Sequence, residues 1–355
     1  MKIFCLLGTG RSGVDFLQTL FDQHPEISHL PGVFYYQEFW HQLKKKNKNQ
    51  IVKEFIKNHK RFFDSKTYRD ERHHQLGKNK NESFIVKKKK FTKYFLKLCK
   101  NPNNKLEVFI NLHLAYSAAS GENIKKKRII LVNSHQIRHL EGLKDFDYKI
   151  ILNIRHPICS LNSSINHWLA FSKKNVDLWW LDYQINRLVN LIDSCVKLRK
   201  KIYVVRLDLL HTQNIEYVKK ILKVMDIKFN KCLNQSTYHG KLWWGDKLSI
   251  KYLNGFNKKF KDKYNKSNFY ERDIAYFNHF FSFYYSNYKY KKIKSESFKR
   301  LYKFLPIKLE LIVWKNLLIN FNISQILLIP YYWFKRIKMI KIKNKKQLNK
   351  YPKLI

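Results

Sequence analysis

The 355-residue chain has few acidic residues, few glycines and prolines, and no cysteine pattern typical of a metal site. It contains 26 Asp and Glu against 71 Lys and Arg, for a formal net charge of +45, with 10 Gly and 7 Pro. Its five cysteines are scattered, at positions 5, 99, 159, 195 and 232. This excludes zinc-finger spacing and favours reduced thiols in the core. No apolar run reaches the roughly 20 uninterrupted residues that a membrane-spanning helix needs.

Arginine is also scarce, because only 13 of the 71 basic residues are arginines. Asn, Ile, Tyr and Phe are abundant, which is typical of a bias toward A/T-rich codons. A charge of this size often indicates a nucleic-acid or membrane partner. Since no zinc-finger, aromatic RNA-binding or helix-turn-helix motif accompanies it, we expect no dedicated nucleic-acid partner. The scarcity makes each arginine more informative.

The chain begins with a pattern that predicts a strand, a glycine-rich loop and a helix. Residues 2–7 form an apolar run, and a helical pattern starts at Val14. Glycines between them allow tight turns and a close approach of the backbone to a ligand, and the first N–H groups of the helix can bind an anion. The pattern therefore predicts a phosphate-binding loop. Its residues are Gly8, Gly10, Arg11, Ser12 and Gly13.

Three kinds of nucleotide site use a loop of this type. The glycine spacing fits a dinucleotide-binding loop, but residues 28–32 lack the acidic residue that such a site needs about 20 residues later. The spacing also fits a nucleoside-triphosphatase loop, but Val14 and Asp15 stand where a lysine and a Mg²⁺-binding hydroxyl are required. The third kind is a loop that binds a 5′-phosphosulfate.

A second candidate anion site follows another apolar run. Residues 148–154 have the composition of a buried parallel strand, Arg155 comes directly after them, and Ser163 lies eight residues further on. A guanidinium can bind a phosphate with two N–H groups, and a hydroxyl early in the next helix can donate from the other side. A strand expected at residues 129–134 ends at His135, twenty residues before Arg155.

Together these motifs resemble the sulfotransferases that use 3′-phosphoadenosine 5′-phosphosulfate (PAPS), in particular their Golgi and bacterial carbohydrate-acting branch. Arg11-Ser12-Gly13, followed by His24-Pro25-Glu26, is similar to the family's 5′-phosphosulfate loop. The spacing of Arg155 and Ser163 matches the family's 3′-phosphate motif. The resemblance covers about residues 1–255. It implies transfer of a sulfuryl group to a hydroxyl of a glycan or glycolipid, without a metal.

The resemblance leaves two candidates for the general base. His135 falls at the position of the catalytic histidine in cytosolic family members, although Asn133 replaces the lysine of their motif. Other branches use a glutamate shortly after the first helix, which here is Glu38. A late segment is similar to the part of the family that closes over the nucleotide, which implies cofactor contacts by Lys241 and Trp243.

We predict an α/β fold with a mostly parallel, P-loop-like sheet flanked by helices, a helical insertion and a helical, basic C-terminal extension. Residues 1–297 would form the sulfotransferase domain and residues 298–355 the extension. Within the domain, residues 43–105 are expected to form a helical cap over the acceptor site, or alternatively a plain solvated surface. The predicted strands are residues 2–7, 129–134, 148–154 and 202–207.

The C-terminal extension has no carboxylate after Glu310 and nine Lys or Arg among its last 21 residues. Aromatic and aliphatic segments at 309–321 and 326–334, followed by cations, favour peripheral attachment to an anionic membrane. The alternative is a helical hairpin packed on the core. Because the first strand begins at residue 2, we expect no cleavable signal and a cytoplasmic location, with attachment to the inner membrane face.

Two other functions remain open from the sequence. One is a kinase-like phosphotransferase built on the same loop. The other is a basic protein without catalytic activity that binds membranes or nucleic acid.

Overall fold

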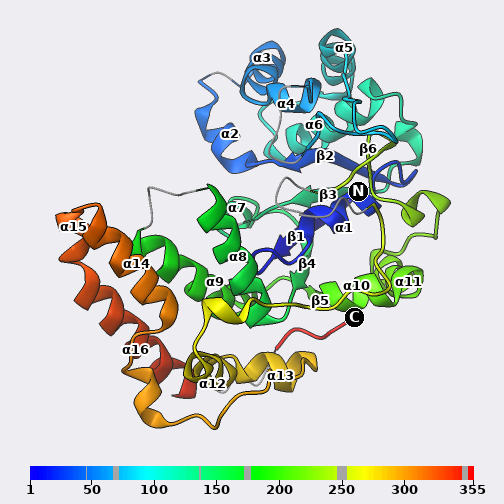
Figure 1. Ribbon diagram of the computed structural model, residues 1–355. Coiled ribbons are helices and arrows are strands. Elements are labelled where there is room, and N and C mark those ends of the chain that lie inside the picture. Colours follow the sequence, from blue (N-terminus) through cyan, green and yellow to red (C-terminus); the bar gives the residue numbers. More distant parts are fainter. Residues whose placement is uncertain (45, 67–71, 136, 172–176, 246–253, 346–350) are drawn as a thin grey trace.

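The computed structural model describes residues 1–355 except 45, 67–71, 136, 172–176, 246–253 and 346–350 (Figure 1). Its central feature is a five-stranded sheet with the order β2-β3-β1-β4-β5, in which every pair of neighbours is parallel. Helices flank this sheet, which confirms the predicted α/β fold class. The strands are β1 (Lys2–Gly8), β2 (Ile27–Val33), β3 (Ile129–Asn133), β4 (Tyr148–Ile154) and β5 (Ile202–Arg206).

Four of these strands agree with the predicted apolar runs to within a residue at each end. Strand β2 was not predicted. It lies at an edge of the sheet, contains Pro31, and its pairing with β3 is irregular between His29 and Val33. Proline cannot donate a backbone hydrogen bond and is tolerated mainly at sheet edges, so an edge strand can lack the apolar pattern that identifies a central one.

The core is built on the sheet because its central strands are buried on both faces. Every residue of β1 after Lys2 is buried, and β3 is buried throughout. Such strands read as continuous apolar runs in the sequence, which is why they are easy to predict. All five cysteines are free thiols, four buried and one half-buried, as expected for core residues.

Helices of the main domain surround the sheet, and several begin at side-chain caps. The side chain of Asn104 accepts a hydrogen bond from Glu107 N at the start of α6, and Asp177 accepts one from Trp180 N at the start of α9. A short antiparallel hairpin, β6 (Thr237–Tyr238) and β7 (Lys241–Leu242), follows the sheet. The helices are α1 (Val14–Leu20), α2 (Tyr36–Gln42), α6 (Lys105–Ala119), α7 (Arg138–Glu141), α8 (Pro157–Phe171), α9 (Leu178–Lys197), α10 (Leu207–Thr212), α11 (Asn214–Met225), α12 (Glu271–Phe280) and α13 (Ser282–Tyr288).

The lysine-rich insertion forms α3 (Lys48–Asn58), α4 (Lys60–Phe63) and α5 (Lys88–Leu98). Its apolar residues recur at helical spacing and are buried, while its lysines lie mostly on the exposed faces. The rings of Phe55 and Phe91 stack with centroids 5.2 Å apart and join α3 to α5. The insertion therefore packs as a helical layer against α6.

The C-terminal extension contains α14 (Lys308–Ile319), α15 (Ile323–Ile326) and α16 (Ile329–Lys345). Both α14 and α16 pack against α9. We call the parts of α14 and α16 that contact α9 the base of the hairpin. For this base, the alternative of a helical hairpin packed on the core holds. Among the described residues, no helix is long and apolar enough to cross a membrane. The last residues return to the sheet, where Val204 N donates to Lys353 O at 3.1 Å and Ile355 N donates to Val204 O at 3.0 Å.

Candidate active site

The glycine loop connects β1 to α1 and has a sharply turned backbone. Gly10, Arg11 and Gly13 all have positive φ, at 83°, 47° and 80°. A Cβ on Gly13 would lie 2.4 Å from Leu207 Cδ1, and one on Gly8 would lie 2.5 Å from Ser12 Oγ. The positive φ favours glycine at positions 10 and 13, while Arg11 holds a left-handed conformation that is uncommon for a residue with a side chain.

Side chains from neighbouring elements fasten the loop through its carbonyl groups. Ser160 Oγ donates to Gly10 O at 2.5 Å, and Asn153 Nδ2 donates to Gly13 O at 3.2 Å. Arg187 Nη2, from α9, donates to Gly8 O at 3.1 Å. Binding the carbonyls from outside fixes the curvature of the loop, which is the arrangement that an N–H-lined anion site needs.

Within this loop, the Ser12 hydroxyl is buried without a hydrogen-bond partner. The residue is 2% exposed, and its Oγ has no partner among the residues that the structure describes. Buried polar atoms are almost always hydrogen-bonded, so an unpartnered hydroxyl inside a glycine loop indicates a missing acceptor. A phosphate oxygen would supply one.

The second predicted anion site lies beside the first. Arg11 Nε donates to Ser163 Oγ at 3.5 Å, and Arg155 Nη1 donates to Arg11 O at 3.5 Å. Arg155 follows β4 and Ser163 lies on α8, so the carboxyl end of the strand and the start of the helix bring both to the glycine loop. Arg155 Nε also donates to Asp262 Oδ1 at 2.6 Å, in a pair with side chains that are 15% and 14% exposed.

His135 is held next to the loop by a carboxylate. Its Nε2 lies 3.1 Å from Asp15 Oδ1, and Asn133 Nδ2 donates to the same oxygen at 2.8 Å. Burial alone would raise the pKa of the Asp15 carboxyl, but the charge and hydrogen bond of His135, with Asn133 and Arg11, lower the pKa to about 2. Asp15 is therefore an ionised partner that orients the imidazole ring.

Glu38 belongs to a neighbouring cluster rather than to the loop. Its side chain on α2 is 54% exposed, and its Oε1 lies 3.3 Å from His139 Nδ1. The His139 ring stacks on Tyr35 with centroids 3.7 Å apart. Tyr35 follows β2 and His139 follows β3, so this cluster occupies the same carboxyl edge of the sheet, beyond His135.

Lys241 and Trp243 are not brought to the glycine loop. The hairpin that carries Lys241 is fastened at the opposite end of α1, where Gly240 N donates to Asp22 Oδ2 at 2.8 Å. Lys241 Nζ pairs with Glu82 of the insertion at 2.5 Å, and Trp243 is buried against the Tyr238 ring. In these positions Lys241 joins the insertion to the domain, and Trp243 packs within the domain beside the hairpin. Residues 246 and 247, at the end of this segment, lie outside the described part of the chain.

Two residues at the site were missed in the sequence. Besides binding Gly8 O, Arg187 Nη2 donates to His135 O at 2.9 Å, so one half-buried arginine joins the loop to the candidate base. Asp262 lies in an irregular segment with no motif around it. The scarcity of arginine was a usable clue to Arg187, whereas only the folded chain brings Asp262 to Arg155.

No protein-family model matches the sequence, and no curated protein matches it. Among solved structures, the fold is similar to the sulfotransferase domain from the curacin biosynthetic pathway, with 12% identity, a TM-score of 0.40, and coverage of 74% of this chain and 93% of that one. The sulfotransferase domain from the Synechococcus PCC 7002 olefin synthase gives 12% identity and a TM-score of 0.37, covering 71% of this chain and 80% of that one. Sulfotransferase STF9 from Mycobacterium avium gives 12% identity and a TM-score of 0.35, covering 65% of each chain. These values are too low to assign a function, which rests instead on the residues of the site.

Proposed function

We propose that this protein is a sulfotransferase that uses PAPS as the sulfuryl donor and a hydroxyl of a glycan or glycolipid as the acceptor. The observation that carries the proposal is the meeting of two anion-binding motifs at one edge of the sheet. Arg11 of the glycine loop contacts Ser163, and Arg155 contacts the loop backbone. A nucleotide with phosphates on both the 5′ and 3′ oxygens needs two such sites side by side.

Each motif suits one of the two phosphates. Gly8 and Gly10 let the backbone approach the 5′-phosphosulfate, and Arg11 with the N–H groups of Ser12 and Gly13 would hold its phosphate. The unpartnered Ser12 hydroxyl adds a donor at the same place. Arg155 and Ser163 would bind the 3′-phosphate, since a guanidinium and a hydroxyl provide charged and neutral donors to its oxygens.

The base is assigned to His135. PAPS supplies the sulfuryl group, which is transferred as the bond from sulfur to the bridging 5′-phosphate oxygen breaks and the bonding electrons leave with the phosphate. His135 would accept the proton of the acceptor hydroxyl as its oxygen bonds to sulfur. The Asp15 carboxylate, 3.1 Å from His135 Nε2, would orient the ring and stabilise the imidazolium that forms. Arg11 and the loop N–H groups would stabilise the charge that develops on the leaving phosphate.

The acceptor would lie at the edge beyond His135. Tyr35, Glu38 and His139 follow the ends of β2 and β3, where the half-buried Tyr35 ring stacks on the buried His139 ring and the Glu38 carboxylate is half exposed. Aromatic rings and carboxylates are suited to the faces and hydroxyls of sugars. Glu38 remains the alternative base, placed next to the acceptor rather than next to the donor.

A nucleotide titration without Mg²⁺ tests this function. We expect 3′,5′-diphosphoadenosine to bind more tightly than ATP. Arg155→Ala should weaken its binding by about 10- to 150-fold, because a lost charged hydrogen bond costs about 1.5–3 kcal/mol. Binding of 5′-AMP should change little in the same variant.

Arg199→Ala is the matched control, because Arg199 is an exposed arginine that follows α9 and lies outside the site. Equal weakening of both nucleotides by Arg155→Ala would contradict the 3′-phosphate assignment. A preference for ATP with Mg²⁺ would favour the kinase-like alternative, and binding of neither nucleotide would favour a protein without catalytic activity.

A further inference from the structure

The C-terminal hairpin exposes a concentration of large apolar side chains at its end. We call residues 318–334 the apolar tip, which comprises the end of α14, all of α15 and the start of α16. Of the sixteen large hydrophobic residues that are exposed in the described chain, eight lie in this segment. Contiguous exposed apolar surface is uncommon on soluble monomers and marks interaction sites. The eight residues are Leu318, Ile319, Phe321, Ile323, Leu327, Leu328, Tyr331 and Phe334.

Phe321 is the most exposed member of the tip. It is 84% exposed and has a positive φ of 47° at the turn between α14 and α15. A left-handed conformation disfavours a bulky residue, and an exposed turn of this kind usually takes glycine or asparagine. A phenylalanine held outward at this turn is difficult to explain by folding alone.

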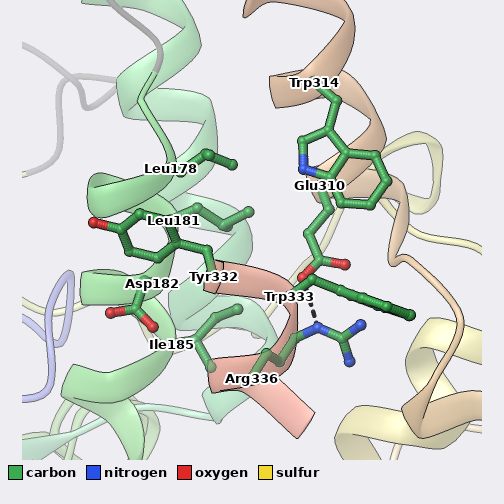
Figure 2. Close-up of a pocket in the computed structure, with 9 residues that line it drawn as sticks. All are labelled: Leu178, Leu181, Asp182, Ile185, Glu310, Trp314, Tyr332, Trp333 and Arg336. Carbon is green, nitrogen blue, oxygen red and sulfur yellow. Dashed lines mark hydrogen bonds and ion pairs between the residues drawn. The ribbon is translucent and has the colours of Figure 1, made fainter. Parts of the chain in front are cut away.

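The base of the same hairpin is firmly attached to the domain. Arg336 Nε donates to Glu310 Oε1 at 2.6 Å, and both side chains are less than a tenth exposed. Figure 2 shows these two side chains directed toward one another between α14 and α16. In this view, helix α9 lies on the side of α16 that faces away from α14. Lys335 Nζ pairs with Asp182 of α9 at 2.7 Å. The tip therefore projects from a fixed support.

Within the C-terminal extension, the charged residues that flank the tip are cations, and the neighbouring carboxylate, Asp182 of α9, is paired with Lys335. Glu310 is the last carboxylate in the sequence, and it is already paired with Arg336. Lys315 and Lys338 are exposed on either side of the tip. Aromatic and aliphatic side chains flanked by lysines are the combination that binds the interface of an anionic bilayer, with apolar insertion and electrostatic attraction acting together.

We propose that the apolar tip inserts into the surface of an anionic membrane while the base of the hairpin stays packed on α9. In Figure 1, β1 runs from the N-terminus toward the side on which α14 and α15 lie, so the glycine-loop edge and the tip are on the same side of the protein. Docking through the tip would therefore bring that edge near the bilayer. This inference depends on exposure and charge alone and does not require the proposed activity.

Point variants in the tip test the proposal with the full chain. The probe is sedimentation with phosphatidylcholine vesicles, with and without phosphatidylglycerol. We expect binding that requires the anionic lipid and weakens with added salt. The double variant Phe321→Ser/Leu327→Ser should bind at least about tenfold more weakly, because each buried apolar side chain contributes strongly to insertion. Thermal unfolding should be unchanged, since both side chains are exposed.

The matched control is Ile85→Ser/Leu301→Ser, which removes two residues that are 73% and 61% exposed outside the tip. This control should bind vesicles like the wild type. A second measurement uses Phe321→Trp, and the emission of the new tryptophan should shift to the blue when anionic vesicles are added.

Three results would overturn the proposal. These are equal losses in the tip and control variants, an unshifted tryptophan emission with vesicles, and a protein that associates with itself in sedimentation velocity until the tip variants abolish the association. The last result would assign the tip to a second copy of the chain.

Discussion

The glycine-loop edge and the base of the C-terminal hairpin each contain an arginine paired with a carboxylate at 2.6 Å from Nε. At the hairpin base, Arg336 is 3% exposed and also donates to the carbonyls of Lys303 and Leu305. At the loop edge, Arg155 is 15% exposed and its nearest neighbours are loop atoms and the irregular segment that carries Asp262. The same type of ion pair is therefore almost fully buried at the hairpin base and partly exposed at the loop edge.

The difference shows what each pair can do. Each nitrogen of the Arg336 guanidinium donates to an acceptor of the protein, so this pair fixes the position of α14 against α16. A guanidinium at an edge with an unpartnered hydroxyl nearby can exchange a carboxylate for a phosphate without a large change in the charge around it. The partly exposed setting at the loop edge is compatible with the proposed exchange for a phosphate, whereas the buried setting at the hairpin base holds two helices together.

His135→Ala has the largest expected effect. It should change catalysis at the glycine-loop edge and not the stability that the hairpin base provides. If His135 is the base, turnover should fall by about 10²- to 10⁴-fold while binding of 3′,5′-diphosphoadenosine stays close to wild type. The measurement is steady-state sulfate transfer beside a binding titration. Glu38→Gln is the comparison, and a large loss there with normal turnover in His135→Ala would exchange the two roles.

Arg336→Ala, at the base of the hairpin, should lower the stability of the protein. Removing one partner of a buried ion pair leaves Glu310 uncompensated, at a cost of about 3–5 kcal/mol in the free energy of unfolding. Urea unfolding measures this loss. The double variant Arg336→Met/Glu310→Gln should recover most of it, because no buried charge remains. If the double variant is as unstable as the single one, packing rather than charge accounts for the effect.

Low pH should weaken the domain and not the hairpin, because residues 298–355 contain no histidine. Burial lowers the pKa of His113 from 6.5 to about 4, so the unfolded chain binds more protons between these values. Stability is therefore complete above pH 6.5 and falls as the pH drops toward 4, with His113 alone contributing about 2 kcal/mol of the loss at pH 5.

The urea midpoints of unfolding at pH 7 and pH 5 test whether stability falls as the pH is lowered. His113→Phe should show a smaller decrease between the two pH values than the wild type does. An unchanged decrease would mean that other buried histidines, such as His239, carry the pH dependence.

Asp262→Asn has the smallest expected effect. It tests directly whether a phosphate replaces the Asp262 carboxylate as the partner of Arg155. Removing the carboxylate frees Arg155 from a partly exposed ion pair that is worth about 0.2–1 kcal/mol. The affinity for 3′,5′-diphosphoadenosine should therefore rise by up to about fivefold, whereas 5′-AMP should bind as before. Weaker binding of 3′,5′-diphosphoadenosine would show that Asp262 positions Arg155 and does not compete with the phosphate.

The sequence by itself determined the glycine loop and the four strands other than β2. These are local features, because a strand buried on both faces must be continuously apolar and a tight loop must place glycine where a Cβ would collide. The same reasoning could not find β2, since an edge strand with a proline has no distinctive pattern.

Only the tertiary structure decided which distant residues meet. Asp262 reaches Arg155 across 107 positions, Arg187 reaches Gly8 across 179, and Lys241 pairs with Glu82 instead of approaching the loop. In the extension, the sequence identified apolar segments and cations but could not divide them into a buried base and an exposed tip. That division depends on which faces of α14 and α16 are covered by α9, a contact between helices that are distant in the sequence.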